Sequence, residues 1–492
     1  MAGNPGGWGP PPGGGGPFGP PGGGGGGPFG PPGGGGGGFG PPGGGGFGPP
    51  GGMPPSGGGF GPPGGGGPFG PPGGGGGGGP FGPPGGGGGF NPMQPPGGGG
   101  QWGMPQPPPP SSSGSNKNLF IGIPKETTFQ EHRVPLTPAS VAVLVGRGND
   151  VVIERGAGMA VQFQDSDYTE AGAMLADSAE EVFKADLILK VAPPSPKEVE
   201  LCKPKQILIS ALQMTAQPKD ALRRMMEKKV TAVAWDFIKD REGIYPVIRA
   251  MGEIAGNTSV QIAAEHLSTD KGGPGLMLGG ISGVAPAEVV IIGAGTVGEF
   301  ATRAALGLGA SVKVFDKSIY RLRRLQSDLA QRIYTSVIQP DELKRALQQA
   351  DVAIGALRPE QGRTPMVVTE DMVREMKNGS VIVDVSIDRG GCFETSRPTD
   401  LSDPVFKKFG VLHYCVPNIA SRVPRTASYA LTNIFAPLLL GMGDVGGFEE
   451  LIKRDLGLRH GVYLYNGALT SEVLSEAFRL PYKDLDILLA AF

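Results

Sequence analysis

Hydrophobic and polar positions alternate in a regular order from Asn118 to the end of the chain. Short apolar runs, typical of buried strands, are separated by amphipathic runs, typical of helices. The segment 137–148 predicts a helix, because Thr137 suits the N-cap, Pro138 the first turn and Gly148 the position after the end. Five apolar runs predict strands: LFIGI (119–123), DVVIE (150–154), DLILKVA (186–192), ILISAL (207–212) and TAVAWDFI (231–238). Such alternation indicates a parallel sheet covered by helices on both faces.

The same order continues in the second half of the chain. A long helical pattern at 248–267 is expected to cross into a second domain. The segment 287–316 predicts strand, glycine turn, helix and strand, and 340–387 adds further helices and strands. From 426 onward the chain is predicted to be helical and to fold back on the first domain, because its apolar faces need a partner.

Residues 1–116 differ from the rest in composition. They contain no Asp, Glu, Lys or Arg, and repeats such as PFGPPGGGGGG place a Phe at intervals among Gly and Pro. Such a segment cannot bury enough apolar surface to offset its ordering entropy, so we expect a disordered tail that ends in the proline-rich linker 105–116. Its function could be weak multivalent contact, but an inert solubilising extension is the simpler hypothesis.

Charge and cysteine usage narrow the class of protein. The net charge is −2, so no basic excess favours nucleic acid or an anionic membrane as a partner. The chain start has no charged segment followed by an apolar one, and no stretch reads as a membrane span, which indicates a cytoplasmic protein. Cys202, Cys392 and Cys415 are odd in number and lack metal-site spacing, which fits reduced thiols and predicts no metal.

A dinucleotide-binding pattern lies at Gly293, Gly295 and Gly298. These glycines follow a predicted strand, open a helix, and precede a second strand that ends in Asp316, which is the context that makes the pattern specific. The glycines allow the tight turn, the approach of the pyrophosphate and the close packing of helix on strand. Asp316 would accept hydrogen bonds from the ribose hydroxyls and repel a 2′-phosphate, so NAD is the predicted cofactor. The alternative interpretation is a glycine-rich turn with an exposed Asp and no cofactor.

Several long motifs together resemble the alanine dehydrogenase family, which includes the soluble NAD-binding component of transhydrogenases. They are IGIPKE, HRVPLTPAS, LILKVAPP, GGISGV, VVIIGAGTVG, VIVDVSIDRGGCFE and YCVPNIASRVPRTASYAL. The resemblance covers residues 119–490 and implies reversible NAD-dependent deamination of L-alanine to pyruvate and ammonia. It implies an α/β fold of two Rossmann-like domains with parallel sheets and a cleft between them, and a homo-oligomer, commonly a hexamer. Domain boundaries are then expected at 1–116 (tail), 117–246 (substrate domain, first part), 247–424 (NAD-binding domain) and 425–492 (C-terminal helices that complete the substrate domain).

The resemblance also assigns roles in the site. Arg133 matches the arginine that binds the substrate carboxylate, for which a planar fork is well suited. Lys190 matches a lysine that contacts substrate and can polarise the carbonyl oxygen of pyruvate. Asp388 matches an active-site aspartate that could orient or deprotonate the attacking water or ammonia. Without the resemblance, Arg133 could be a surface arginine, Lys190 a solvated strand end and Asp388 a helix or loop cap.

Further cofactor contacts follow from the same match. They are Thr296 and Val297 in the glycine turn, Arg321 beyond Asp316, Leu357, Val385, Ile387 and Asp388 in the segment after a strand, and Asn418.

Two positions depart from the family pattern. Gln213 stands where the family has a histidine that serves as proton donor and acceptor, and an amide cannot carry a proton at neutral pH. Asp388, Lys190 or water could take over proton transfer, the enzyme could be slower, or it could act on a different substrate or none. Gly252 replaces a serine that often touches the cofactor, which would cost about 0.5–1.5 kcal/mol.

Two other functions are compatible with parts of the sequence. A soluble component of a transhydrogenase is disfavoured because Asp388 stands where that branch lacks an acid. A non-catalytic NAD(H)-binding protein is suggested by Gln213 and the tail. Activity that depends on pyruvate, ammonia and NADH would separate these hypotheses.

Overall fold

The computed structural model describes residues 117–212, 219–329, 331–359 and 362–490. Both the predicted tail at 1–116 and Gln213 lie outside the described residues.

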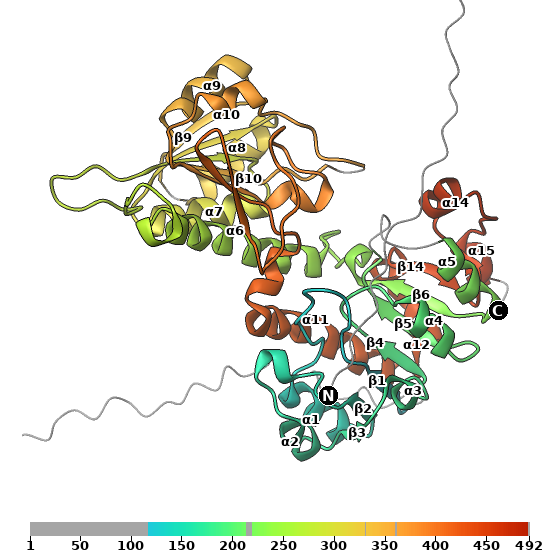
Figure 1. The fold of residues 1–492 in the computed structure, drawn as a ribbon. Helices are drawn as coiled ribbons and strands as arrows, with labels where there is room; N and C mark the ends of the chain where they lie inside the picture. The colour runs from blue at the N-terminus through green and yellow to red at the C-terminus, as the bar shows by residue number, and fades with distance from the viewer. Residues whose placement is uncertain (1–116, 213–218, 330, 360–361, 491–492) are drawn as a thin grey trace, which may run out of the picture. The chain divides into compact units, whose positions relative to one another are not determined.

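An eight-stranded sheet combines the first part of the described chain with its C-terminal end (Figure 1). Its strand order is β15-β14-β6-β5-β4-β1-β2-β3. The bounds are β1 Phe120–Ile123, β2 Asp150–Glu154, β3 Met174–Ala176, β4 Leu187–Leu189, β5 Ile207–Ser210, β6 Thr231–Ala234, β14 Val462–Tyr465 and β15 Ala468–Leu469. Strands β1 to β6 pair in parallel, as the alternation of strands and helices predicts.

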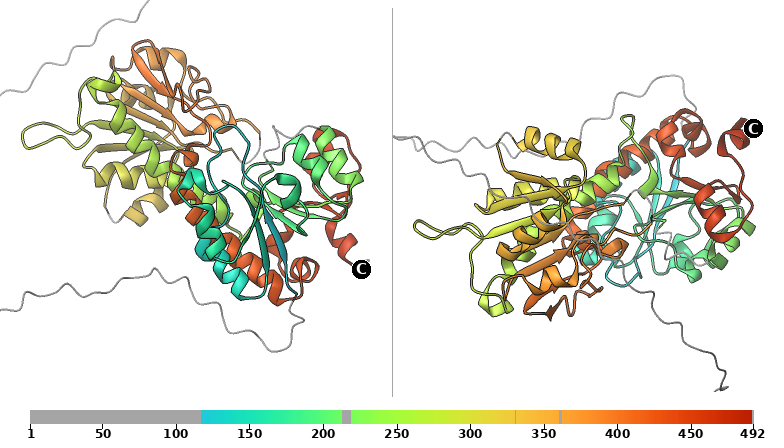
Figure 2. Two further views of the ribbon diagram at one scale, coloured as in Figure 1. Left: turned by 60° about the horizontal axis from the view of Figure 1, so that its bottom comes forward. Right: turned by 90° about the horizontal axis from the view of Figure 1, so that it is seen from above.

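Helices cover both faces of this sheet because alternate strand residues point to opposite sides. In β4, Leu187 and Leu189 pack in one apolar cluster with α1 (Pro138–Gly146) and α11 (Pro424–Asp444), whereas Ile188 packs in another with α3, α5 and α14. Figure 2 shows α1 and α11 side by side, and the contacts between them agree. The remaining helices around this sheet are α2 Asp165–Glu170, α3 Ala179–Val182, α4 Pro196–Leu201, α5 Lys219–Glu227, α12 Phe448–Arg454, α13 Leu456–Arg459, α14 Glu472–Phe478 and α15 Leu485–Ala490.

A seven-stranded sheet lies in the second half of the chain, in the order β12-β13-β11-β10-β7-β8-β9. Its strands are β7 Glu288–Ile292, β8 Ser311–Asp316, β9 Tyr334–Val337, β10 Val352–Gly355, β11 Val381–Asp384, β12 Val405–Lys408 and β13 Val411–Tyr414. Val289 and Ile291 of β7 pack with α7 (Thr296–Gly307), and Val290 and Ile292 pack with α9 (Pro340–Gln349) on the other face. The helices α8 and α10 span Ile319–Leu329 and Glu370–Arg374. The doubly wound α/β class predicted from the sequence is therefore confirmed.

The long helix predicted at 248–267 is α6 (Pro246–His266), which packs on α7 of the second sheet and on α11 of the first. Glycine makes the α6–α7 contact possible, since a Cβ at Gly256 would lie 2.4 Å from the carbonyl oxygen of Val297. No single helix among these residues is long and apolar enough to cross a membrane; α11 and α12 meet the criteria of length and composition only as a pair, bent by 103°.

The structure differs from the sequence prediction at the sheet edges. The segment after 426 is not purely helical, because β14 pairs antiparallel with β6, and β15 pairs antiparallel with β14 at that edge of the first sheet. In the second sheet β12 is antiparallel to β13. The run TAVAWDFI ends as a strand at Ala234 and turns into a short 3-10 helix, Trp235–Phe237.

Candidate functional site

The glycine turn after β7 has the close approaches that the sequence pattern predicts. Gly293 has φ 118°, and a Cβ there would lie 2.5 Å from the carbonyl oxygen of Ala356. A Cβ on Gly298 would lie 1.8 Å from the carbonyl oxygen of Gly293, so helix α7 can approach β7 only with glycine at this position. Nothing lies within 4 Å of a Cβ built on Gly295. The turn therefore keeps open space at its middle glycine, at the N-terminal end of α7, where phosphate oxygens find free backbone N–H groups and a favourable dipole.

Asp316 ends β8 beside this turn and is 1% exposed. One carboxylate oxygen accepts a hydrogen bond from the backbone N–H of Ala294 (2.7 Å), and the other accepts one from that of Ser318 (2.8 Å). The guanidinium of Arg321 on α8 lies 4.0 Å away. Each carboxylate oxygen can accept a further hydrogen bond, so Asp316 can both fix the turn and bind a ribose hydroxyl.

Helix α6 borders the same turn through Gly252. A Cβ at this position would touch the side chains of Thr296 and Val297 at 3.4–3.6 Å, which is ordinary van der Waals distance. The two residues predicted to contact the cofactor therefore lie at the start of α7 and against α6. A serine would fit at position 252, so glycine is not required there by packing.

A second segment of predicted cofactor contacts follows β11 as a 3-10 helix, η4 (Val385–Arg389). It includes Val385, Ile387 and Asp388. The backbone N–H of Leu357 donates to the Ser386 hydroxyl (2.9 Å), which ties the loop after β10 to this helix. These residues therefore share the carboxyl edge of the second sheet with the glycine turn, which is where ligands bind in open α/β sheets.

Arg133 lies in the loop between β1 and α1, and its side chain is 5% exposed. Its Nε donates to Glu131 Oε1 (2.7 Å), and its Nη2 donates to Glu131 Oε2 (2.5 Å). The Nη1 group is 3.2 Å from the sulfur of Met251 on α6. A guanidinium carries five donors, so this pairing leaves the edge formed by Nη1 and the second Nη2 hydrogen for another anion. Arg133 pulls the pKa of Glu131 below its usual value, despite the opposing effect of burial, which is the largest single influence.

Asn418 joins Arg133 to Asp388. Its backbone N–H donates to Asp388 Oδ1 (2.7 Å), and its side-chain Nδ2 donates to Glu131 Oε2 (3.0 Å). Asn418 adopts φ 54°, a left-handed conformation that Asn tolerates better than most residues. The structure thus brings three of the predicted site residues into one hydrogen-bonded chain through Glu131.

Asp388 is crowded by protein, yet its side chain still reaches water. Loss of solvation raises its pKa, and the Asn418 N–H and the charges of Arg133, Arg389 and Arg358 oppose that rise. A carboxyl group whose pKa is raised is better suited to general acid–base catalysis near neutral pH.

Lys190 follows β4 directly and is fully buried. Its Nζ lies 3.0 Å from Glu126 Oε2 and 3.1 Å from Glu198 Oε1. Burial opposes its charged form, but both carboxylates favour that form more strongly and raise the pKa of Lys190. The ammonium is therefore held in a fixed position by two carboxylates.

Among the residues that the structure describes, no hydrogen bond joins a histidine ring to Arg133, Lys190 or Asp388. His413 is fully buried, its ring bonds Thr395 and the Val411 carbonyl, and burial lowers its pKa to about 4. His266 is buried on α6, next to the ring of Tyr414. His132 is exposed, whereas its neighbour Arg133 is buried.

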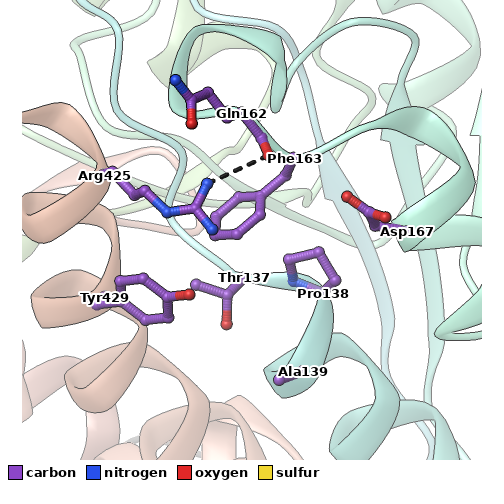
Figure 3. A pocket seen from close by; sticks show the side chains of 8 residues that line it. All are labelled: Thr137, Pro138, Ala139, Gln162, Phe163, Asp167, Arg425 and Tyr429. Carbon is purple, nitrogen blue, oxygen red and sulfur yellow. Dashed lines mark hydrogen bonds between the residues drawn. The ribbon is translucent and has the colours of Figure 1, made fainter.

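A separate surface pocket of about 300 Å³ lies where the start of α1 meets α11 (Figure 3). Arg425 crosses it, donating to the carbonyl oxygens of Val161 (2.6 Å) and Gln162 (3.2 Å) and covering the ring of Phe163 at 4.5 Å. Tyr429 packs edge-on against Phe163. These contacts fasten α11 to the first sheet's loops, which is a structural role.

Two acidic residues of the site were not predicted from the sequence. Glu126 ends the motif IGIPKE, and Glu131 precedes Arg133 by two positions. Both stand in motifs that carried the family resemblance, but a glutamate in a loop has no local signature, and only the fold brings each one to its basic partner.

The fold has two mostly parallel sheets covered by helices, with a glycine-rich turn after β7 and the carboxylate of Asp316 beside that turn. These features define a nucleotide-binding protein of the Rossmann class. The family model "Alanine dehydrogenase/PNT, N-terminal domain" matches residues 122–255. The family model "Alanine dehydrogenase/PNT, C-terminal domain" matches residues 259–472. The chain belongs to the alanine dehydrogenase/PNT family.

Individual relatives agree with the family assignment. An alanine dehydrogenase of Mycolicibacterium smegmatis is 40% identical over 367 residues, which are 74% of this chain and 98% of that protein. A solved L-alanine dehydrogenase is 37% identical with a TM-score of 0.69, covering 73% of this chain and 99% of that one. The transhydrogenase of Sinorhizobium meliloti is 25% identical with a TM-score of 0.62, covering 72% and 99%.

Proposed function

We propose that this chain catalyses the reversible, NAD-dependent oxidative deamination of L-alanine to pyruvate and ammonia. The observation that carries the proposal is the chain of hydrogen bonds from Arg133 through Glu131 and Asn418 to Asp388, in a member of the alanine dehydrogenase family. It links a carboxylate-binding group to a carboxylate that can handle protons.

The substrate carboxylate binds Arg133 in this proposal. Glu131 holds one edge of the guanidinium, so the other edge faces the ligand with little freedom to rotate. Fixed donors lose less entropy on binding than mobile ones, and a bidentate contact also orients the substrate. Lys190 contacts the group attached to Cα, which is an amine in alanine and a carbonyl oxygen in pyruvate.

Asp388 orients or deprotonates the water that attacks the imine carbon. The glycine turn would hold NAD, which would supply the acceptor for the hydride of Cα. Gly293, Gly295, Thr296, Val297 and Gly298 receive the pyrophosphate, while Asp316 and Arg321 lie at the ribose side. Leu357, Val385, Ile387 and Asn418 border the nicotinamide side. Gln213, which lies outside the described residues, is proposed to touch the substrate through its amide.

Purified protein should oxidise NADH in the presence of both pyruvate and ammonia, and Asp388→Ala should abolish this activity. Retention of NADH binding by the variant, measured by fluorescence titration, controls for unfolding. Full activity of Asp388→Ala would remove this residue from the mechanism. NADH binding without turnover in the wild type would instead indicate the non-catalytic NAD(H)-binding protein.

A transhydrogenase component is the second candidate, because the transhydrogenase of Sinorhizobium meliloti shares the fold. That function predicts NADPH formation from NADH only when membrane partners are added. It also predicts no reaction of pyruvate with ammonia.

A homo-oligomer is proposed for the assembled protein, with a hexamer as the expected form, in the cytoplasm and without nucleic-acid or membrane partners. The loop before β7 supports association, because it exposes the apolar side chains of Met277 (68%), Ile281 (66%) and Val284 (58%). The division into a substrate domain (117–246 with 425–492) and an NAD-binding domain (247–424) belongs to the same proposal. Light scattering of the full chain gives the oligomeric state directly.

A further inference from the structure

A buried cluster beside the proposed site holds two carboxylates against one ammonium. Lys190 is fully buried, and the side chains of Glu126 and Glu198 are only 5% and 7% exposed. Both carboxylates lie within hydrogen-bond distance of Lys190 Nζ. Excess negative charge in a buried cluster favours the uptake of a proton, because an unpaired buried charge is costly.

The two carboxylates have different surroundings. Glu198 belongs to the N-terminal capping box of α4, where its Oε2 accepts from the backbone N–H of Ser195 (2.6 Å). Glu126 reaches the end of β4 from another loop, and its Oε1 accepts from the backbone N–H groups of Val191 (2.5 Å) and Ala192 (3.3 Å). Glu198 therefore has a structural task within its own helix, whereas Glu126 has none in its own segment.

The groups that face Glu126 set its affinity for a proton. Burial raises its pKa to about 7, and the charge of Glu131 adds to the rise. Lys190 and the Val191 N–H oppose it. Glu126 is thus a group of this site that titrates near neutral pH, in a chain whose family histidine is replaced by Gln213.

We propose that Glu126 is the proton acceptor of the site and acts through Lys190, which contacts the substrate. This inference rests on the proposed deaminase function and deepens it, by naming the group that replaces the missing imidazole. Glu126 does not touch the substrate, so it is a positioning and proton-holding residue.

The proposed step moves one proton from the alanine ammonium group to Glu126. An N–H bond of Lys190 breaks first as an O–H bond forms on Glu126 Oε2, and the electron pair left on Nζ makes Lys190 a neutral amine. That lone pair then takes a proton from the substrate ammonium group, so Lys190 begins and ends the step as an ammonium. The electron pair of the broken substrate bond becomes the lone pair of a neutral amine, which drives the departure of hydride from Cα to NAD. Glu126 later returns its proton to solvent.

The sign of the pH dependence follows from the direction of transfer. Glu126 must be ionised to accept a proton, so alanine oxidation is lost as the pH falls through about 7. In the reverse direction Glu126 must be protonated, so reductive amination is lost as the pH rises through the same value.

The experiment compares full-length wild type with Glu126→Gln, Glu126→Asp and the matched variant Glu198→Gln. Wild-type alanine oxidation should show an acid limb near pH 7 that is absent in Glu126→Gln, whose rate falls by about 10²–10⁴-fold. Glu126→Asp should restore an acid limb. Glu198→Gln also removes a carboxylate from Lys190, but it leaves the proposed proton acceptor in place, so it should keep the wild-type limb. An unchanged acid limb in Glu126→Gln overturns the proposal.

A second measurement does not depend on turnover. The infrared band of a carboxylic acid C=O should titrate near pH 7 in wild type and Glu198→Gln but be missing in Glu126→Gln. Absence of that difference overturns the inference even if the enzyme deaminates alanine. Presence of the band without any alanine-dependent NAD reduction refutes the proposed function instead, and with it the catalytic role of Glu126.

Discussion

Replacement of Arg133 by lysine tests how the site binds a carboxylate. The guanidinium is fixed through Nε and Nη2 by Glu131, at 2.7 and 2.5 Å, and its free edge is proposed for the substrate. Lysine keeps the positive charge beside the buried Glu131 carboxylate, so the fold is not left with an uncompensated charge. It cannot bind Glu131 and present a two-pronged donor to the substrate at once.

The expected loss is one charge-assisted hydrogen bond to the substrate, worth roughly 1.5–3 kcal/mol. Because every ~1.4 kcal/mol is tenfold, kcat/KM for alanine should fall by about 10–150-fold. Steady-state kinetics at saturating NAD measure this change. NADH affinity should fall less than kcat/KM, since Arg133 is not among the residues proposed to contact the cofactor. His132→Ala, at the exposed neighbouring position, is the matched control and should leave kcat/KM unchanged.

An Arg133→Lys variant with unchanged kcat/KM and a normal melting temperature would refute this reasoning. It would mean that the substrate carboxylate binds elsewhere. Loss of NADH binding together with activity would point to a structural defect rather than a lost substrate contact.

Three further predictions concern the cofactor and the tail. Gly295→Ala should fold normally, because a Cβ there meets nothing within 4 Å, yet NADH should bind more weakly to this variant in a fluorescence titration. Gly298→Ala should fail to fold or lose stability, because its Cβ would lie 1.8 Å from the Gly293 carbonyl oxygen. Equal melting temperatures for the two variants would contradict this contrast. Wild-type protein should bind NADH at least several-fold more tightly than NADPH, and Asp316→Asn should reduce that difference in affinity. Equal affinities of the wild type for NADH and NADPH would argue against the assigned role of Asp316. Deletion of residues 1–116 should leave kcat and KM unchanged, so a large kinetic change would assign the tail a function.

The fold was predictable to the extent that local periodicity determined it. The α1 helix begins and ends where Thr137, Pro138 and Gly148 predict, because caps and turns are set by neighbouring residues. Strand β14 was missed, because four residues near the end of the chain become a strand only through pairing with β6, more than 200 positions earlier. Long-range pairing of this kind leaves a weak local signal.

The site was predictable where a residue's role follows from its own motif. The glycine positions follow from geometry. The roles of Arg133, Lys190 and Asp388 come from the resemblance and stay predictions. Glu126 and Glu131 were not predicted, because their importance depends on which basic side chain the fold brings to them. The acid–base behaviour of such groups is a property of the packed cluster and not of the sequence near either glutamate.

The central claim is tested most directly by a panel of 2-oxo acids with ammonia and NADH, assayed on the wild type and on Gln213→His. Pyruvate should react fastest among the panel, and the histidine should raise the rate, because an imidazole can carry the proton that an amide cannot. If no 2-oxo acid reacts with either protein, the assignment as an alanine dehydrogenase is contradicted.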